Sequence, residues 1–411
     1  MANVFNNVKD APGIIAKAAA QTLKDNLVFC NTIDMADKSD FDGKNGYKAG
    51  DTIYTSVPAR YIPQTSFDIT SSKQDSVEEK RALTLDTIST IGMEIDSFEF
   101  ATEVQLKDTI KRFVVPAAES IAQDVERRFL EKATDATFNS TGTAGSNGFT
   151  VADVLSGRTK LNQNLCPRGD RSFLLDSESG ASAVDARKGL FQSSTEINKQ
   201  YLDGMVGRAD GFDWYENELI TTHTNGNDVT GVAVNDAAVA EGATTLAVDG
   251  LTNTTGTVTK GTVFTIAGVN MVHPITKVVT SRPQQFVVTA DATANGSGQA
   301  TLSISPALYA GSGGLQNIDA LPADNAALTF VGSASTGYAQ NLQYHKSAFK
   351  MVSVPLIMPT AVEVAAQETV DGITVSVIRA FDVDQRRMIT RLDFLGGLSA
   401  VRPEWANRVT A

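Results

Sequence analysis

Cysteine, histidine and long apolar runs are all scarce in this chain of 411 residues. The two cysteines, Cys30 and Cys166, lie far apart in the sequence, which excludes a disulfide framework and a cysteine-based zinc cluster. No apolar run reaches the roughly 18 residues of a membrane-spanning helix, and residues 1–20 lack a cationic stretch followed by an apolar core. The sequence therefore predicts a soluble protein, made in a reducing compartment and neither exported by a signal peptide nor inserted in a membrane.

Groups that carry catalysis or bind metal ions are equally sparse. The three histidines, His223, His273 and His345, are widely spaced, and none forms a pair with metal-ligand spacing. Neither a nucleophile-elbow motif nor a phosphate-loop motif occurs. His273 precedes Pro274 in a Val/Thr-rich stretch, and we expect it to be a hydrogen-bonded residue at a strand end. The sequence predicts no enzyme, no cofactor and no metal site.

Two acidic patterns imitate functional sites without meeting their requirements. Residues 37–49 resemble a calcium loop, but Lys38 and Ala49 stand where the first and last carboxylates are needed, so we interpret the stretch as a polar turn. Asp382 and Asp384 are spaced like a pair of catalytic carboxylates. On an alternating strand, however, they simply share one face, which we expect to be solvated.

Charge and composition limit the class of protein further. Lys and Arg number 35 against 47 Asp and Glu, which gives a net charge of −12. A general nucleic-acid binder needs a basic stripe to displace phosphate counterions, so this balance argues against that class. The 42% apolar and 20% charged content is typical of a folded chain, and the length suggests two or three domains.

The N-terminal region predicts a helix over residues 12–29, where apolar side chains recur at spacings of three and four. Pro12 suits the first helical turn. Because the helix precedes the main body of the chain, we interpret it as an N-terminal arm. It either packs on its own domain or contacts a partner.

Residues 43–96 carry the pattern of a long hairpin. Residues 51–57 are β-branched and aromatic, residues 82–95 return as a strand, and residues 73–81 between them are charged and poor in apolar side chains. Two strands alone are marginally stable, so we expect this arm to lie on another subunit; an ordinary surface hairpin is the alternative. The candidate intersubunit contacts are its charged residues Glu78, Glu79, Lys80 and Arg81.

The strongest helical pattern covers residues 102–136. Charged residues, among them Glu126, fall mostly opposite its apolar stripe. Because Pro116 lies inside the pattern, we predict a break near Phe113 and a long helix that starts at Val115 or Pro116. The stripe consists of Ile110, Phe113, Val114, Ala117, Ile121, Val125 and Phe129.

Shorter elements follow the long helix. Residues 150–163 predict a helix with Thr150 as its cap and Asp153 in its first turn. Residues 171–176 (RSFLLD) predict a buried strand. Two further helical stretches and a strand are expected at residues 182–189, 195–203 and 213–219.

The composition changes at residue 224. Residues 224–335 contain seven acidic and three basic residues, so about 9% of them are charged, against 20% in the whole chain. Short alternating runs separated by turn residues predict a small all-β barrel or sandwich; they lie at 228–234, 244–248, 261–269, 286–290 and 300–304. After residue 336 the character is mixed again, with strands expected at 348–354, 374–378 and 386–393. The β unit is therefore interpreted as an insertion into a larger α+β domain.

The most distinctive stretches lie within and after the insertion. They are residues 260–269 (KGTVFTIAGV) with Val272, His273 and Pro274, residues 284–290 (QQFVVTA) and 304–306, then Phe349, Pro355 and residues 400–404 (AVRPE). In these stretches and in its order of elements, the chain resembles the major capsid (coat) proteins of tailed bacteriophages, in the branch related to the coat protein of phage P22. That family has an HK97-type fold, and its P22-like branch carries an inserted β-barrel domain.

The resemblance implies an α+β, HK97-like capsid fold. It divides the chain into an N-terminal arm (1–36), an extended loop with a flanking peripheral strand (37–96), a peripheral domain with a spine helix (97–148), the first part of an axial domain (149–223), an inserted β-barrel domain (224–335) and a return segment (336–411). One departure concerns residues 231–246, which are short and apolar where the family has a long polar loop that contacts neighbouring capsomers. That contact is either absent here or made elsewhere.

The resemblance also implies a structural function in the virion. Pentamers and hexamers of the chain would assemble in the host bacterial cytoplasm, with a scaffolding protein and a portal protein at one vertex, into an icosahedral shell. The shell would enclose double-stranded DNA without sequence-specific binding and without contact to a membrane. The acidic charge agrees with an inner wall that should not retain packaged DNA.

The alternative is a surface or tail-associated protein whose β domain binds a cell-surface ligand. It accounts for the β insertion, but not for the long helix or the charged hairpin. Adhesive domains also tend to expose aromatic platforms, and residues 224–335 contain only Phe264, Phe286, Tyr309 and Phe330 as aromatic residues. If the insertion is an autonomous domain, its flanks His223 and Thr336 lie close together.

Overall fold

The computed structural model describes residues 11–35, 48–57, 61, 67, 73, 79–96, 110–146, 148–187, 207–311, 314–357, 364–382 and 387–410. The chain divides into two compact units. The first comprises residues 1–55, 81–130 and 350–399, and the second comprises residues 56–80, 131–349 and 400–411. Most of the predicted turn at 37–49, the helix predicted at 195–203, Glu78 and Asp384 lie outside the described residues.

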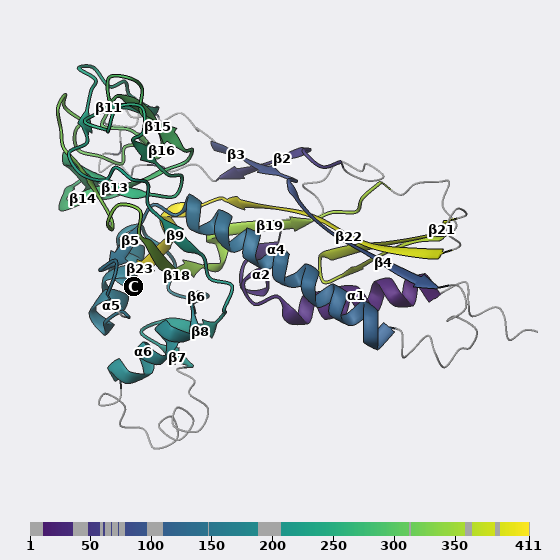
Figure 1. Ribbon diagram of the computed structural model, residues 1–411. Helices are drawn as coiled ribbons and strands as arrows, with labels where there is room; N and C mark the ends of the chain where they lie inside the picture. Colours follow the sequence, from purple (N-terminus) through teal and green to yellow (C-terminus); the bar gives the residue numbers. More distant parts are fainter. Residues whose placement is uncertain are drawn as a thin grey trace, which may run out of the picture. The chain divides into compact units, whose positions relative to one another are not determined.

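The first unit is built on a six-stranded sheet (Figure 1). Its strands follow the order β1 (Asp34–Met35), β19 (Phe349–Ser353), β22 (Arg387–Ala400), β21 (Ile373–Asp382) and β20 (Val364–Val370), and β4 (Thr87–Asp96) also pairs with β22. Strand β1 runs parallel to β19, whereas β20, β21, β22 and β4 pair in antiparallel fashion. Asp371 and Gly372 both have positive φ and close the β20–β21 hairpin, as Asp-Gly does in tight hairpin turns.

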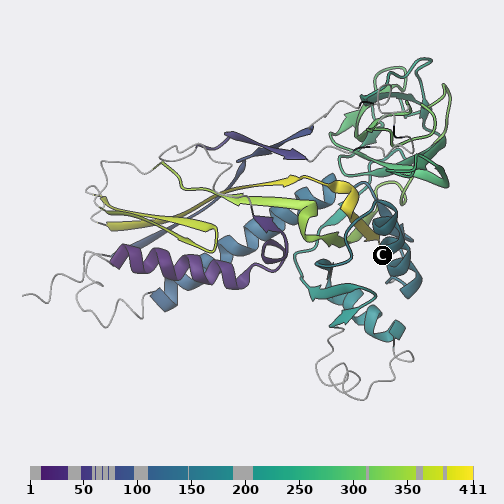
Figure 2. The same cartoon turned by 180° about the vertical axis from the view of Figure 1, so that it is seen from behind.

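The predicted N-terminal helix is confirmed as α1 (Ala11–Asn26), which is followed by the short α2 (Phe29–Thr32). Helix α1 lies along strands β20 and β21 of its own unit (Figures 1 and 2). Its buried side chains are Ile15, Ala16, Ala19, Ala20 and Leu23. Of the two alternatives for the arm, packing on its own domain is therefore what the structure shows.

The break before the long helix is confirmed. A π-helical turn, Ile110–Val114, precedes α4 (Val115–Ala136). The stripe is buried from Val114 onward, but Phe113 was assigned to it wrongly, since this side chain is 50% exposed. An i→i+5 turn changes the angular spacing of successive residues, and the helical period therefore does not extend back through it.

The extended hairpin differs from its prediction in one respect. Strand β2 (Thr52–Val57) pairs with β3 (Glu79–Thr84), but the single return strand expected over 82–95 is two strands. The chain leaves β3 at Leu85, whose N–H donates to Asp51 O (2.9 Å) and whose carbonyl accepts the N–H of Gly50 (2.8 Å). Strand β4 then enters the large sheet. Alternating apolar residues continue through Leu85, so the pattern alone contains no sign of this change of partner.

The second unit contains a seven-stranded sheet. Its order is β5 (Ser140–Gly142), β23 (Ala406–Thr410), β18 (Gly337–His345), β6 (Arg171–Leu175), β8 (Phe212–Glu216) and β7 (Arg208–Ala209), with β9 (Thr222–Thr224) also pairing with β18. Helices α5 (Val151–Gln163) and α6 (Ser177–Arg187) belong to the same unit. The predicted cap is confirmed, since Thr150 and Asp153 form a reciprocal capping box. Aromatic residues Phe149, Phe173, Phe212 and Trp214 form the buried core beside this sheet.

Six strands within residues 224–335 form a separate sheet. They follow the order β10 (Ala233–Val234), β11 (Ala243–Asp249), β16 (Ala300–Leu308), β14 (Val279–Val288), β13 (Val263–Val272) and β17 (Leu328–Phe330). An antiparallel bridge between Ala233 and Ala327 joins the first strand to the end of the last, so the sheet closes on itself. Strands β12 (Thr257–Val258) and β15 (Ala292–Thr293) form a small additional pair. Most of residues 228–234, predicted as a strand, is loop, and β17 was not predicted.

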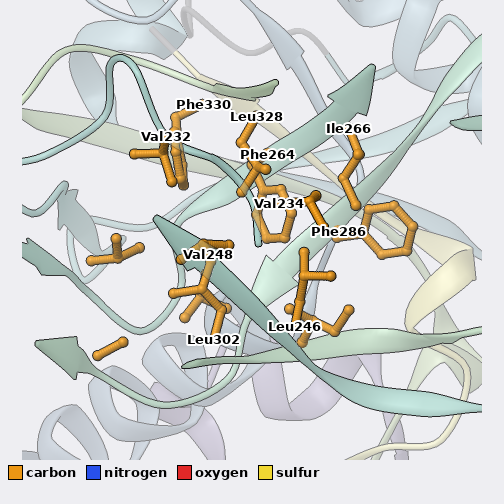
Figure 3. Packing of buried hydrophobic residues seen from close by; sticks show 14 of the residues in the cluster. Val232, Val234, Leu246, Val248, Phe264, Ile266, Phe286, Leu302, Leu328 and Phe330 are labelled. Carbon is orange, nitrogen blue, oxygen red and sulfur yellow. The ribbon is translucent and has the colours of Figure 1, made fainter. Parts of the chain in front are cut away.

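The closed sheet encloses its own apolar core. Phe264 is fully buried, with its ring centroid 5.8 Å from that of Phe286 and 5.6 Å from that of Phe330. Aliphatic side chains from the surrounding strands converge on these rings (Figure 3); they include Val232, Val234, Leu246, Val248, Ile266, Leu302 and Leu328. A continuous core of this kind is what a segment needs in order to fold by itself.

Candidate functional site: the exposed ribbon and the neck

The paired strands β2 and β3, here called the ribbon, have one covered and one exposed face. Ile53 and Leu83 point into an apolar cluster of the first unit, which also contains Leu85, Val352, Val354 and Leu395. On the opposite face the hydroxyls of Thr52 and Thr84 lie 3.4 Å apart. Tyr54 is 65% exposed. The ribbon is therefore held on one side and open to a partner on the other.

The candidate contact residues lie at the start of β3. Glu79, Lys80 and Arg81 are consecutive residues of this strand, and Lys80 and Arg81 are exposed. Glu78, the fourth candidate, precedes the strand outside the described residues. Whether any of the four contacts another subunit stays a prediction.

Sequence reasoning missed the aromatic residues of this region. Tyr54 and Tyr61 are 65% and 55% exposed, and Phe67 is fully exposed. Aromatic side chains are enriched in protein interfaces, where they account for much of the binding energy. Tyr54, Tyr61 and Phe67 lie close together in the sequence, but no local pattern distinguishes a contact residue from a core residue.

The second candidate region, here called the neck, is where the closed sheet joins the seven-stranded sheet of the same unit. His223 pairs with Tyr338, and Thr224 pairs with Gly337, in the antiparallel β9–β18 ladder. The N–H of Asn225 donates to Thr336 O at 3.3 Å. The chain thus enters and leaves the closed sheet side by side, which confirms the expected proximity of His223 and Thr336.

Arg408 is the central residue of the neck. It lies on the C-terminal strand β23 and is only 1% exposed. Its guanidinium donates to Thr137 O at the end of α4 (Nε, 2.8 Å) and to Gly261 O of the closed-sheet segment (2.7 Å). Burial lowers the pKa of Arg408 to about 10, and Asp135 acts in the opposite direction. The side chain therefore remains a cation at neutral pH. It links strand β23 to the end of α4 and to the closed-sheet segment.

An ion pair accompanies this link. Lys260 Nζ lies 2.8 Å from Asp135 Oδ2, and the backbone N–H of Lys260 donates to Asp291 Oδ1 at 2.7 Å. Burial alone would lower the pKa of Lys260, but Asp135 raises it above its ordinary value. The next residue, Gly261, has a φ of +87°, and a Cβ there would lie 2.7 Å from Asp135 Oδ1. The positive φ favours glycine at this position, and a side chain there would also displace the Asp135 carboxylate from the ion pair.

His223 is the histidine of the neck. Its Nε2 lies 3.2 Å from Thr262 Oγ1. The pKa of His223 is lowered to about 4, mainly by burial and also by the Arg408 cation, while Asp135 opposes both effects. The cavity beside His223 and Arg408 has a volume of about 10 Å³, room for about one water molecule. This is a structural joint and not a ligand site.

A second contact holds the closed sheet against α5 and β5. Lys160 Nζ donates to Ser140 O and to Gln285 Oε1. The amide of Gln285 completes the arrangement, since Ser140 N–H donates to its Oε1 at 2.9 Å and its Nε2 donates to Ser140 O at 3.0 Å. Burial lowers the pKa of Lys160 to about 7, with a contribution from the Arg282 cation.

The remaining histidines have structural partners. His273 Nδ1 accepts the N–H groups of Ile275 and Thr276, as expected for a residue at a strand end, and His345 Nδ1 accepts the N–H of Ser347. Within the described ranges, no cluster of three or more His, Cys, Asp or Glu side chains could bind a metal ion. None of the helices in the described part of the chain is long and apolar enough to cross a membrane.

The described residues thus form a mixed helix-and-strand fold with an exposed two-stranded ribbon and a closed sheet inserted through a paired neck. Residues 1–407 match the family described as P22 coat protein, gene protein 5, and the chain belongs to this family. It is accordingly a major capsid protein, a component of the virion that forms the shell.

Solved structures similar to this chain include phage capsids. The Mycobacterium phage Che8 structure is 12% identical, with 93% of this chain and 90% of that chain covered and a TM-score of 0.44. The capsid of Ralstonia phage GP4 is 7% identical, with coverages of 92% and 87% and a TM-score of 0.43. The CUS-3 coat protein I-domain is 26% identical and covers 25% of this chain and 96% of its own, with a TM-score of 0.19. No curated protein sequence matches the chain.

Proposed function

We propose that this coat protein assembles as pentamers and hexamers into an icosahedral shell that encloses double-stranded DNA. The match of residues 1–407 to the coat protein family carries this proposal. Repeated use of one heterologous surface gives closed rings, and rings of two sizes close a shell. A scaffolding protein and a portal protein at one vertex would assist assembly in the host cytoplasm. The chain performs no catalysis in this role.

The parts of the chain have distinct tasks in this proposal. Helix α4 is the spine helix of the peripheral domain (97–148), and residues 149–223 begin an axial domain that the return segment 336–411 completes. The closed sheet is the inserted β-barrel domain of residues 224–335. Its closure by the Ala233–Ala327 bridge and its separate core support this assignment.

The ribbon, with residues 37–96 around it, is the extended loop that contacts a neighbouring subunit. Its open face and the exposed aromatic side chains of Tyr54, Tyr61 and Phe67 support this role. An isolated two-stranded ribbon has too little buried surface to be stable alone. One face of the ribbon is already buried against Val352, Val354 and Leu395 of its own chain, and contact with a second subunit would bury the open face.

Charge reversal at the ribbon tests this role. The double substitution Glu78→Lys and Glu79→Lys should leave the melting temperature of the monomer unchanged but reduce the yield of shells in a sucrose gradient. A double reversal at Asp236 and Asp324 makes the same change in net charge on the closed-sheet segment and serves as the control. A variant that melts earlier as a monomer, yet assembles normally once folded, would show that the ribbon is not an intersubunit element.

A further inference from the structure

The hairpin between β15 and β16 carries an Asn-Gly dipeptide, Asn295–Gly296, at its tip. The sequence contains four such dipeptides, which begin at residues 45, 147, 225 and 295, and the structure describes both residues of the last two. An asparagine side chain is most easily attacked by the backbone when glycine follows it, because glycine has no Cβ to obstruct the approach. Whether a given Asn-Gly pair reacts therefore depends on the structure around it.

The side chain of Asn295 is folded back onto the backbone that follows it. Its Oδ1 accepts the N–H groups of Ser297 at 2.8 Å and Gln299 at 3.0 Å. This Asx-turn arrangement directs Cγ toward the backbone of Gly296. The same two N–H groups stabilise the negative charge that develops on Oδ1 when Cγ is attacked, as the donors of an oxyanion hole do. The hydrogen bonds therefore both position and activate the carbon that would be attacked.

The attacking nitrogen and the leaving group are both unbonded in this hairpin. Within the described ranges, neither the N–H of Gly296 nor Nδ2 of Asn295 has a hydrogen-bond partner, and both residues are exposed to water. The base of the hairpin is fixed, since the N–H of Asn295 donates to Gln299 O at 2.8 Å and the N–H of Gly298 donates to Asn295 O at 3.1 Å. The reacting groups thus stay together at a hydrated tip.

The other described Asn-Gly pair, Asn225–Gly226 in the neck, has the opposite surroundings. Asn225 is only 3% exposed, and its Nδ2 donates to Val331 O at 2.9 Å and to Ser333 O at 3.2 Å. Its leaving group is therefore hydrogen-bonded and shielded from water. The backbone of Gly226 is closely packed as well, since a Cβ there would lie 2.0 Å from Thr257 O. The same dipeptide is thus open to reaction at one site and protected at the other.

We propose that Asn295 is a site of spontaneous deamidation that needs no enzyme. Hydroxide removes the proton of the Gly296 nitrogen, which forms a bond to Asn295 Cγ. The Cγ–Nδ2 bond then breaks, and ammonia leaves with a proton taken from water, which restores the hydroxide. Water opens the resulting five-membered succinimide ring at either carbonyl and gives aspartate or isoaspartate. The net reaction consumes one water molecule and releases one ammonia.

The modification changes the surface of the closed-sheet segment. Each conversion replaces a neutral amide by a carboxylate. An aspartate accepts the same two N–H groups through stronger, charge-assisted bonds, so the hairpin keeps its shape. An isoaspartate instead adds one carbon to the main chain before Gly296 and shifts the pairing with Gln299. The site therefore gives the folded chain a surface charge that depends on its age, whether or not the chain is assembled, and in this respect the inference goes beyond the proposed function.

Peptide mapping of the full chain by mass spectrometry tests the proposal. During incubation of the folded protein at mildly alkaline pH, the peptide with Asn295 should be converted at least about tenfold faster than the peptide with Asn225. Chromatography should resolve an aspartate and an isoaspartate product. The rate should rise with pH, because the deprotonated nitrogen of Gly296 is the nucleophile. In urea both sites should react at similar rates, because only the fold distinguishes them.

Gly296→Ala is the matched variant. No heavy atom lies within 4 Å of a Cβ at Gly296, and φ there is not positive, so the variant keeps the hairpin. Its methyl group obstructs ring closure and should slow the conversion of Asn295 about tenfold, with no effect at Asn225. Equal rates at the two sites in the folded chain, or a difference that persists in urea, overturn the proposal. Conversion of Gly296→Ala at the wild-type rate also overturns it, because the reaction then bypasses the ring.

Discussion

His223 on β9 lies directly opposite Tyr338 on β18, so the chain enters and leaves the closed sheet through one antiparallel pair of strands. The hydroxyl of Tyr338 accepts the N–H of Ser333 at 2.7 Å, and the side chain of Asn225 donates to Val331 O at 2.9 Å. Both ends of the insertion are therefore fixed at one point. Within the seven-stranded sheet, the inserted segment acts as one long loop whose ends lie side by side. The loop-closure entropy grows only slowly with the length of a loop, so such an insertion destabilises the sheet little.

Residues 222–339, expressed alone, should form a soluble and cooperatively folded β domain. The segment keeps its closed sheet, its aromatic core and the β9–β18 pair that joins its ends. It loses Phe138, which covers Val263 and Val287 in the whole protein, so its stability should be lower than that of the intact unit. Amide proton dispersion and a single urea transition would be measured; a disordered fragment would show that the segment is not autonomous.

Truncation of Phe264 should destabilise that fragment strongly. The side chain is fully buried between Phe286 and Phe330, and Phe→Ala in a core costs about 3–5 kcal/mol through lost burial and a cavity. Urea denaturation of Phe264→Ala measures the loss, with Thr245→Ala at an exposed position of β11 as the control. A loss below about 1 kcal/mol would mean that the aromatic cluster is not the centre of the core.

The buried Glu126 should stabilise the packing of the N-terminal arm against its own unit. Its Oε1 accepts the backbone N–H groups of Val28 (3.1 Å) and Phe29 at the start of α2. Burial raises the pKa of Glu126, while these donors oppose that effect by stabilising its ionised form. Glu126→Ala leaves the donors buried without their carboxylate, at a cost of about 1–3 kcal/mol. Limited proteolysis within residues 11–35 should accelerate in this variant and not in Glu119→Ala on the same helix.

The neck should make the stability of the whole protein depend on pH. The pKa of His223 is lowered to about 4 in the folded state, against roughly 6.5 in an unfolded chain. The unfolded state therefore binds the proton more tightly, and the free energy of unfolding falls as the pH drops from about 6.5 to 4. His223→Gln should remove this part of the pH dependence of the melting temperature, and His273→Gln should not. Parallel curves for wild type and His223→Gln would refute the assignment.

Local sequence rules predicted those elements that local chemistry determines. Pro116 set the start of α4, Thr150 and Asp153 set the start of α5, and the apolar run at 171–175 gave the buried strand β6. The composition change at residue 224 located the closed sheet, whose strands β11, β13 and β16 were anticipated in approximate position, whereas β14 (Val279–Val288) begins seven residues before the run expected at 286–290.

The elements that were missed depend on distant partners. Strand β23 (ANRVT) shows no apolar alternation, yet all five residues are buried because β5 and β18 flank it and Arg408 binds the carbonyls of Thr137 and Gly261. Glu126 was expected opposite the apolar stripe of its helix, and only the position of α2 makes it a buried cap. Tyr54, Tyr61 and Phe67 are exposed, but no local signal in the sequence distinguishes them from core residues.

Negative-stain electron microscopy of the expressed wild-type chain, alone and with the proposed scaffolding protein, tests the central claim most directly. We expect closed shells of uniform diameter, or rings of five and six subunits as their precursors. A protein that remains strictly monomeric under every assembly condition, while its thermal transition shows that it is folded, would contradict the claim that this chain forms the shell.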